Sequence, residues 1–390
     1  MRVLIVNKFY YLRGGDCIAA ISAERLLKSK GHEVAVFSMQ HPDNLSSVWE
    51  KYFPKAVDFS GSGIAGKWSA AVRIFHSPEV ARKFKRLLAD FQPEVVHIHN
   101  IHSYLSPLVA RIASQKGIRV VWTLHDYKLI CPVYTCLRNG MVCEACFLNK
   151  LCVVWHKCMK NSFIASKLAY LEARYWNRKK LSGITHTFIS PSRFLKTKMT
   201  RAGFSPDQIV VVPNFMPQQP VPGTVKDDYY CYVGRISAEK GVDTLLQAAG
   251  GLPYRLKIIG GGPLLDAYRR QYPLQQVDFL GPMSPEALYP IVQKARFLVL
   301  PSIWYENNPV SVIEALCMGT PVLGARIGGI PELITEGENG YLFTPGDVAD
   351  LQQKIKHIFH VTFDYHEIAS QGYRKFSPDT FYNQLISIFR

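Results

Sequence analysis

"LVLPSIWYENNPVSVIEALCMGTPVLGARIGGIPELI", residues 298–334, is the stretch of sequence that decides the fold. Its short apolar runs "LVLP" and "PVLGA" have the length and composition of buried strands. Between them Asn308 is a good N-cap and Pro309 is favoured at the first helical position, which predicts a helix that stops at Gly319 and Pro321. A strand, a helix and another strand in this order indicate a βαβ unit of a parallel sheet.

The same alternation extends in both directions from this stretch. Strand-like runs in the first half are "RVLIVN", "EVAVFS", "EVVHIH", "RVVWTL", "THTFIS" and "QIVVVP", and those in the second half include "YYCYVGR", "RLKIIG" and "VDFLG". The Pro-rich stretch 213–223 interrupts the pattern, so we predict an α/β protein with two facing Rossmann-like domains. The expected parts are an N-terminal domain 1–213, a linker 214–228, a C-terminal domain 229–375 and a final helix within 376–390.

Length and composition are those of a globular protein. The chain has 390 residues, of which 48% are hydrophobic and 19% are charged, enough for two domains with a core each. No apolar run reaches the roughly 18 residues of a membrane span. The N-terminal apolar stretch is too short for a signal peptide, so a cytoplasmic location is expected.

Charge is distributed unevenly along the chain. Residues 1–213 carry 31 Lys and Arg against 13 Asp and Glu, whereas residues 214–390 carry 15 against 17. This asymmetry suggests an anionic partner for the first half. Within it, residues 67–91 alternate apolar and basic side chains as a basic amphipathic helix does, which suits an anionic membrane surface. The alternative is an ordinary solvated helix face above the core.

Several polar and glycine residues follow predicted strands, where ligands bind in parallel sheets. These residues are Gly14, Gly15, His125, Asp126, Arg235, Lys240, Gly260, Gly261, Gly262 and Glu306. Each also has a plainer interpretation as a turn glycine or a surface charge. Their shared position at the ends of strands favours binding.

Glu314 lies inside the predicted helix on the same face as Val310, Cys317 and Met318. A carboxylate on such a half-buried face is costly unless its lone pairs are satisfied. Two ligand hydroxyls could satisfy them, and the alternative is a buried salt bridge to a core arginine.

These motifs together resemble the retaining glycosyltransferases of family 4, which have the two-domain GT-B fold. The resemblance covers nearly the whole chain. In the first half it includes Gly14-Gly15, "VVHIHN", "TLHDY", "FISPS" and "VVPNF". In the second half it includes "YVGRISAEKGVDTLL", "LKIIGGGPL", "VDFLG", "NGYLF" and the opening stretch.

The resemblance implies a nucleoside-diphosphate sugar as donor. Glu314 then accepts hydrogen bonds from the ribose, and Glu306 contacts hydroxyls of the donor sugar. A helix N-terminus suits a diphosphate. The donor-binding residues expected on this basis are Gly14, Gly15, Arg235, Lys240, Gly261, Gly262, Asn307, Asn308, Pro309, Val310, Ser311 and Glu314.

The catalytic residues implied are Glu306, Arg235, Lys240 and His125. Arg235 and Lys240 match the two cations that stabilise the departing diphosphate, and His125 faces the donor sugar. No cofactor or active-site metal is expected, because the chain has no Asp-x-Asp pair, only Asp227-Asp228 in the linker. Transfer with retention needs no nucleophile, although a nucleophilic Glu306 is an alternative.

Six cysteines form a separate cluster in an insertion at 131–160: Cys131, Cys136, Cys143, Cys146, Cys152 and Cys158. A structural zinc held by four of them, with His156 as a further candidate, is one hypothesis, although only one Cys-x-x-Cys pair is present. A cytoplasmic location argues against disulfides.

The expected acceptor is a lipid-linked (polyprenyl-diphosphate) saccharide or a polysaccharide in cell-surface glycan synthesis. The protein would then be peripheral on the cytoplasmic face of the inner membrane. The other functions considered are a GT-B epimerase and a basic nucleic-acid-binding protein, but no nucleic-acid motif appears, so no nucleic acid partner is expected. A last helix from Pro378, capped by Ser377, should cross back to the first domain through Phe381, Leu385 and Ile388.

Overall fold

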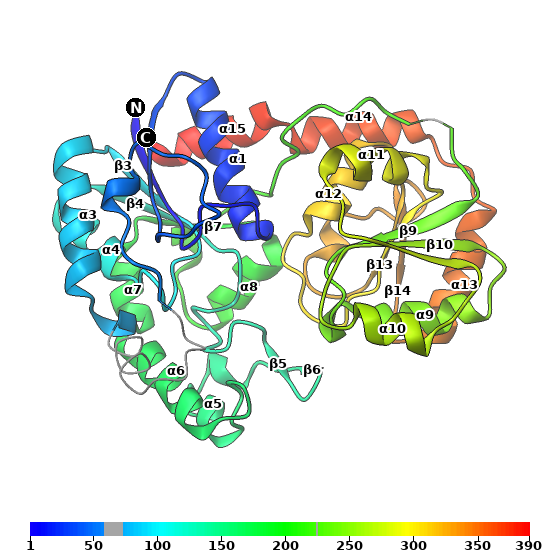
Figure 1. Cartoon of the computed structure of the whole chain (residues 1–390), viewed down its shortest axis with the longest axis horizontal. Helices are drawn as coiled ribbons and strands as arrows, with labels where there is room; N and C mark the ends of the chain where they lie inside the picture. Colours follow the sequence, from blue (N-terminus) through cyan, green and yellow to red (C-terminus); the bar gives the residue numbers. More distant parts are fainter. Residues whose placement is uncertain (58–72, 224) are drawn as a thin grey trace. The chain divides into compact units, whose positions relative to one another are not determined.

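The computed structural model of the protein describes residues 1–57, 73–223 and 225–390. The chain divides into two compact units, each built around its own six-stranded sheet (Figure 1). The first unit contains Met1–Cys136, Cys143–Val212 and Tyr382–Arg390, and the second contains Leu137–Val142 and Pro213–Phe381.

The first unit has a parallel sheet with the strand order β2-β1-β3-β4-β7-β8. Its strands are β1 (Arg2–Val6), β2 (Glu33–Phe37), β3 (Val95–Ile98), β4 (Arg119–Thr123), β7 (Thr187–Ser190) and β8 (Ile209–Val211). Nearly all residues of the inner strands are buried, because helices cover the sheet on both faces. The six runs predicted as strands in the first half of the sequence are therefore confirmed.

The helices of the first unit follow the strands in the alternating order that the sequence predicts. They are α1 (Gly15–Ser29), α3 (Pro78–Phe91), α4 (Leu108–Gln115), α5 (Cys152–Trp155), α6 (Phe163–Tyr175), α7 (Arg178–Ile184) and α8 (Arg193–Arg201). Short 3-10 helices lie at Glu50–Tyr52 (η1), Ala145–Phe147 (η2) and Pro206–Gln208 (η3). The Cys-rich insertion also forms a two-stranded antiparallel hairpin of β5 (Leu137–Arg138) and β6 (Met141–Val142).

The second unit repeats the design with the strand order β11-β10-β9-β12-β13-β14. Its strands are β9 (Tyr229–Val233), β10 (Arg255–Ile259), β11 (Val277–Gly281), β12 (Leu298–Leu300), β13 (Val322–Ala325) and β14 (Gly340–Phe343). The sequence pattern predicted all of these strands except β14. That edge strand begins at a glycine, which weakens the strand signal of the three apolar residues that follow it.

The helices of the second unit are α9 (Val242–Gly250), α10 (Leu265–Gln271), α11 (Pro285–Lys294), α12 (Val310–Cys317), α13 (Val348–Phe359) and α14 (Tyr365–Phe376). Two 3-10 helices, η4 (Ala238–Lys240) and η5 (Ile330–Glu332), lie in its loops. The last helix, α15 (Pro378–Phe389), spans the boundary between the two units. Together with the two sheets, these elements confirm the predicted α/β fold.

The predicted start of α12 is wrong by one residue, and so is its cap. The helix begins at Val310, and Pro309 occupies the cap position without a side-chain hydrogen bond. Oδ1 of Asn308 instead accepts a hydrogen bond from the backbone N–H of Asn214 at 2.8 Å, and Nδ2 of Asn214 donates to the carbonyl of Asn308 at 2.9 Å. A tertiary partner has therefore taken the amide that was predicted to cap the helix.

The last helix begins at Pro378, as predicted, with the Ser377 hydroxyl accepting from the N–H of Thr380 at 3.1 Å. Leu385 and Ile388 are buried, in the part of the helix that belongs to the first unit. Phe381 was expected beside them. It instead stacks on Phe215 of the second unit with ring centroids 4.4 Å apart.

The basic segment 67–91 does not present an apolar face to a membrane where the structure describes it. Residues 67–72, including Trp68 and Val72, lie outside the described residues. In α3 the apolar face is buried through Val80, Phe84, Leu87, Leu88 and Phe91. The alternative interpretation, a solvated basic face above the core, holds for this helix.

Candidate active site

Backbone contacts join the loops that follow β9, β10 and β12, at the carboxyl edge of the second unit's sheet. The N–H of Ile303 donates to the carbonyl of Glu239 at 3.1 Å, and the N–H of Ile236 donates to that of Gly261 at 2.9 Å. Gly241 has φ +66°, and a Cβ there would lie 1.9 Å from the carbonyl oxygen of Pro301. Only glycine fits such a contact, so the backbones of these loops pack directly on one another.

Glu306 is buried in the loop after β12 and receives three hydrogen bonds on one carboxylate oxygen. Oε1 accepts from Nζ of Lys240 at 2.7 Å, from the Ser302 hydroxyl at 2.6 Å and from Nε1 of Trp304 at 2.9 Å. Within the described part of the chain, Oε2 has no hydrogen-bond partner. The carboxylate is thus held by one of its two oxygens.

The environment of Glu306 keeps it ionised. Burial raises the pKa of this carboxyl, but the ammonium of Lys240 and the hydrogen bonds from Lys240, Ser302 and Trp304 outweigh it and bring the pKa below its usual value. Lys240 lies at the end of η4, so sequence-predicted residues from two different loops form one ion pair.

Arg235 lies on the same edge of the sheet and is exposed. Its carbonyl accepts a hydrogen bond from the Tyr232 hydroxyl at 2.8 Å. Gly262 packs on this loop so closely that a Cβ would lie 2.3 Å from the carbonyl oxygen of Ile236. The glycine-rich loop therefore has a packing role, because it supports the segment that carries Arg235.

The N-terminus of α12 lies directly after Glu306, so Asn307, Asn308, Pro309, Val310 and Ser311 form the approach to the helix. The first N–H groups of a helix have no intrahelical partners and carry partial positive charge. This end of α12 can therefore bind an anion.

Glu314 is partly buried on α12 and accepts a hydrogen bond from the Tyr289 hydroxyl at 3.1 Å. Burial raises the pKa of Glu314 to about 7, and the bond from Tyr289 only partly offsets this. No described cation forms an ion pair with Glu314, so the alternative of a salt bridge to a core arginine is wrong for the described residues. Its carboxylate lacks the compensation that Glu306 has.

The sequence-predicted residues of the first unit lie in a polar cluster at the carboxyl ends of β1, β3 and β4. Nε2 of His125 is 2.9 Å from Nδ1 of His99. Nδ2 of Asn100 donates to Asp16 at 3.0 Å and to Asp126 at 3.3 Å. Burial lowers the pKa of His125 to about 4, although the nearby Asp16 opposes this shift. His125 is therefore neutral at pH 7.

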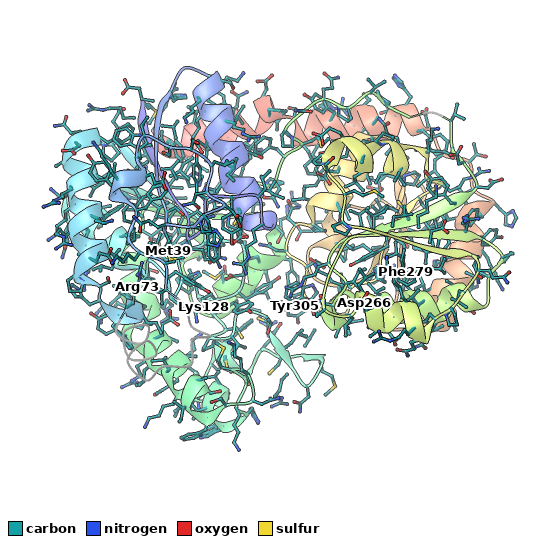
Figure 2. The ribbon with its side chains drawn as sticks, viewed as in Figure 1. Met39, Arg73, Lys128, Asp266, Phe279 and Tyr305 are labelled. Carbon is teal, nitrogen blue, oxygen red and sulfur yellow. The ribbon has the colours of Figure 1, made fainter. Side chains whose placement is uncertain are left out.

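Sequence reasoning did not identify several members of this cluster. Asp16 lies in the first turn of α1, and Lys8 is 3.8 Å from its carboxylate. His99 has a signal in the sequence, because it follows His97 by two residues and side chains two apart in an extended segment point to the same side. Lys128, labelled in Figure 2, forms an ion pair with Glu172 of α6 at 2.8 Å.

Gly14 and Gly15 lie where β1 leads into α1, and space is open around them. A Cβ added at Gly15 would meet no described atom within 4 Å, and one at Gly14 would meet only a carboxylate oxygen of Asp16 at 3.7 Å. Packing within the described protein therefore does not require glycine at these two positions. Close approach of a ligand to the backbone would be another reason for glycine at these positions.

The six cysteines of the insertion are all free thiols. Cys131, Cys136 and Cys146 are buried, and hydrogen bonds from the other two thiols lower the pKa of the Cys131 thiol. Across residues 1–57, 73–223 and 225–390, no three His, Cys, Asp or Glu side chains are arranged to hold a metal ion. Zinc binding by these cysteines or by His156 stays a prediction.

Sequence profiles of known protein families match both units. Residues 22–218 match the sequence profile of Glycosyltransferase Family 4, and residues 218–375 match that of Glycosyl transferases group 1. The chain belongs to glycosyltransferase family 4. The predicted GT-B fold and the resemblance seen in the sequence are thereby confirmed.

Individual relatives agree with this family. The chain is 26% identical over 397 residues to an uncharacterized 42.6 kDa protein in the cps region of Klebsiella pneumoniae, an alignment that covers 94% of this chain and 99% of the relative. It is 28% identical over 284 residues to the sulfoquinovosyl transferase SQD2 of Arabidopsis thaliana, covering 70% of this chain and 51% of SQD2.

Solved structures share the fold at low identity. The apo form of the lipopolysaccharide outer core galactosyltransferase WaaB has a TM-score of 0.63 at 20% identity, covering 100% of this chain and 99% of WaaB. HepE of Anabaena in complex with UDP and glucose has a TM-score of 0.68 at 18% identity, covering 99% of this chain and 98% of HepE. Among the described residues of the family 4 chain, no helix has both the length and the apolar character that crossing a membrane demands.

Proposed function

We propose that the chain transfers a sugar, with retention and without a metal ion, from a nucleoside-diphosphate sugar to a hydroxyl of a lipid-linked saccharide or polysaccharide. The observation that carries the proposal is the buried Glu306, which Lys240, Ser302 and Trp304 hold by one oxygen. The donor class agrees with the UDP-glucose complex of HepE. The glycan context agrees with a relative from a cps region and with WaaB.

The second unit supplies the main donor contacts. Arg235, Lys240 and the amides at the start of α12 would bind the diphosphate, and the carboxylate of Glu314 would accept hydrogen bonds from the ribose. Oε2 of Glu306 would accept from hydroxyls of the transferred sugar and hold the ring in position. Gly261 and Gly262 would contribute by supporting the Arg235 loop.

The first unit supplies further donor contacts and the acceptor contacts. Gly14 and Gly15 would allow the donor to approach the start of α1 closely. The neutral His125 would hydrogen-bond to the donor sugar. Its lowered pKa disfavours a role as a cation. Because Nε2 of His125 is in contact with His99, Nδ1 is the ring nitrogen that we assign to the sugar.

The reaction needs no enzyme nucleophile. The bond between the anomeric carbon and the diphosphate oxygen breaks, and the acceptor oxygen bonds to the same face of that carbon. The departing diphosphate takes the proton of the acceptor hydroxyl. Arg235, Lys240 and the α12 amides would stabilise the charge that develops on the diphosphate, which is typically the largest catalytic contribution. These two cations are the reason for proposing that no metal is required.

We place the enzyme at the cytoplasmic face of the inner membrane, where a polyprenyl-diphosphate acceptor is available. The positive first half of the sequence supports an anionic partner. The Asp227-Asp228 pair does not suggest a metal site, because Asp228 is exposed and forms an ion pair with Arg296 at 2.8 Å.

The first experiment is thermal denaturation of the metal-analysed protein with a panel of nucleotide sugars, each with and without EDTA. One donor should raise the melting temperature, and EDTA should leave that rise unchanged. Transfer from this donor to a lipid-linked saccharide then tests the reaction, and the anomeric configuration of the product tests retention. Stabilisation by nucleic acid with no donor effect would overturn the proposal.

A further inference from the structure

An unusual number of large apolar side chains is exposed on α5, on α6 and beside them. The side chains of Leu148 and Ile164 are 93% and 80% exposed, whereas leucine and isoleucine in the core of this protein are buried. Trp155, Phe163 and Leu171 are also exposed. α5 packs against α6 in the lower part of the first unit (Figure 1), so these side chains belong to one region of its surface.

This exposure is not a sign of loosely attached helices. Val153 of α5 and Ala169 of α6 are buried. Glu172 of α6 forms an ion pair with Lys128 at 2.8 Å and accepts from the Ser103 hydroxyl at 3.0 Å. The inward faces of α5 and α6 thus pack on the first unit, and the exposed apolar side chains lie on their outward faces.

The charge of the same segment has one sign. Residues 145–171 contain four lysines and neither Asp nor Glu. Three of these lysines, Lys157, Lys160 and Lys167, are exposed among the apolar side chains. Apolar and aromatic side chains mixed with lysine are characteristic of segments that lie in the interface of an anionic bilayer.

We propose that residues 148–171 form a docking surface for an anionic lipid bilayer. The purpose of this docking surface rests on the proposed function, since it would bring the enzyme to a membrane-bound acceptor. Through Glu172 and Lys128, α6 is connected to the loop after β4 that carries His125 and Asp126. The docking surface is thus linked through one ion pair to the loop to which we assign the donor-sugar contact.

A vesicle sedimentation experiment tests the docking surface without any donor. The full-length protein should sediment with vesicles of equal parts phosphatidylcholine and phosphatidylglycerol, and much less with phosphatidylcholine alone. Ile164→Glu and Leu148→Glu should each weaken binding about tenfold or more, because each replaces an inserted apolar side chain with a charge of the same sign as the lipid. Lys160→Gln should weaken vesicle binding about fivefold, and this effect of the substitution should be smaller at high salt, which screens the attraction between lysine and lipid.

Val48→Glu is the matched control. The exposed fraction of Val48, 81%, is nearly the same as that of Ile164, but Val48 lies in the segment between β2 and η1. Its substitution should leave sedimentation unchanged. Equal losses in Val48→Glu and Ile164→Glu, or no loss in Ile164→Glu, would overturn the proposal. So would a dimer in light scattering that Ile164→Glu dissociates, since the surface would then bind a second copy.

Stabilisation by the nucleotide sugar identified above separates the two proposals. Ile164→Glu should retain it, because that residue is not in the donor site, and this result also shows that the variant folds. Vesicle binding with no donor effect would contradict only the proposed function, whereas a donor effect without vesicle binding would contradict only the docking surface.

Discussion

Glu306 and Glu314 lie on one short segment but have opposite electrostatic environments. Lys240 and two further donors stabilise the Glu306 carboxylate, whereas Glu314 receives a single hydrogen bond from Tyr289. Glu306 is therefore an anion in the free protein. Glu314 holds its proton to a higher pH than Glu306 does, because burial raises its pKa to about 7.

Glu306→Ala should reduce transfer about 100-fold or more while changing nucleotide affinity far less, because Glu306 is assigned to the sugar and not to the nucleotide. Steady-state rates and calorimetric titration with the nucleoside diphosphate measure the two effects. Glu306→Gln is the control, since its amide oxygen can still accept from Lys240, Ser302 and Trp304. It should retain the melting temperature and lose activity. Equal loss of transfer and nucleotide binding in Glu306→Ala would rule out the assigned role.

Donor affinity should rise with pH through the pKa of Glu314, about 7, because the ribose hydroxyls donate to the carboxylate form. Titration calorimetry in buffers of different ionisation enthalpy should detect proton release on binding near pH 7. In Glu314→Gln this release should disappear, which separates it from titration of the ligand's own phosphate. Proton release that persists in the variant would contradict the ribose contact.

The same raised pKa has a consequence for stability. Folded Glu314 holds its proton up to about pH 7, whereas the unfolded chain releases it near its usual pKa. This group therefore favours the folded state at low pH, and its contribution is lost as the pH rises from about 4.5 to about 7. In Glu314→Gln that loss should be absent from the free energy of unfolding measured across this range.

At the scale of elements, the glycines that follow strands differ in whether the fold requires glycine at their position. Gly241 is required by the fold, because its φ is +66° and a Cβ would overlap the carbonyl of Pro301. Gly15 is the first residue of α1 and has open space around it. The sequence presents both simply as glycines after strands.

Gly241→Ala should lower the free energy of unfolding by more than about 2 kcal/mol, because it combines backbone strain with a backbone clash. Gly15→Ala should leave stability unchanged or slightly improved, since alanine is the better helix former. Gly15→Ala should nevertheless weaken nucleotide-sugar binding, because its methyl group occupies the space that we assign to the donor. Denaturant unfolding and calorimetric titration check the pair. Unchanged donor affinity in Gly15→Ala would contradict that assignment.

At the scale of the whole molecule, the end of the chain completes the first unit. Phe389 is buried with its ring centroid 5.3 Å from that of His97 on β3. Nη2 of Arg119 donates to the carbonyl of Arg390 at 2.9 Å. Residues separated by most of the 390 positions therefore share one core, and the first unit depends on Tyr382–Arg390.

Phe389→Ala should cost about 3–5 kcal/mol of unfolding free energy, as large-to-small substitutions of buried aromatic residues do. Scanning calorimetry should show this loss in the transition of the first unit. Gln384→Ala, on an exposed position of the same helix, should change stability by less than about 0.5 kcal/mol. Similar effects of the two substitutions would show that the end of α15 does not belong to the core.

Sequence alone determined the alternation of strands and helices and the family motifs, because apolar runs and turn residues are local signals. It also placed Lys240 and Glu306 on one edge of a parallel sheet. Among the strands of the described residues, β14 and the hairpin of β5 and β6 were missed: β14 begins at a glycine, and β5 and β6 have two residues each.

Tertiary structure alone decided which of several possible partners each side chain takes. Asn308 binds Asn214 and does not cap α12, and the apolar face of α3 packs inside the first unit and is unavailable to lipid. The difference between Glu306 and Glu314 likewise depends on Lys240, which is distant in sequence. A hydrogen bond, a buried face or a pKa is set by what lies within a few ångströms, and folding brings those neighbours from segments that sequence spacing does not relate.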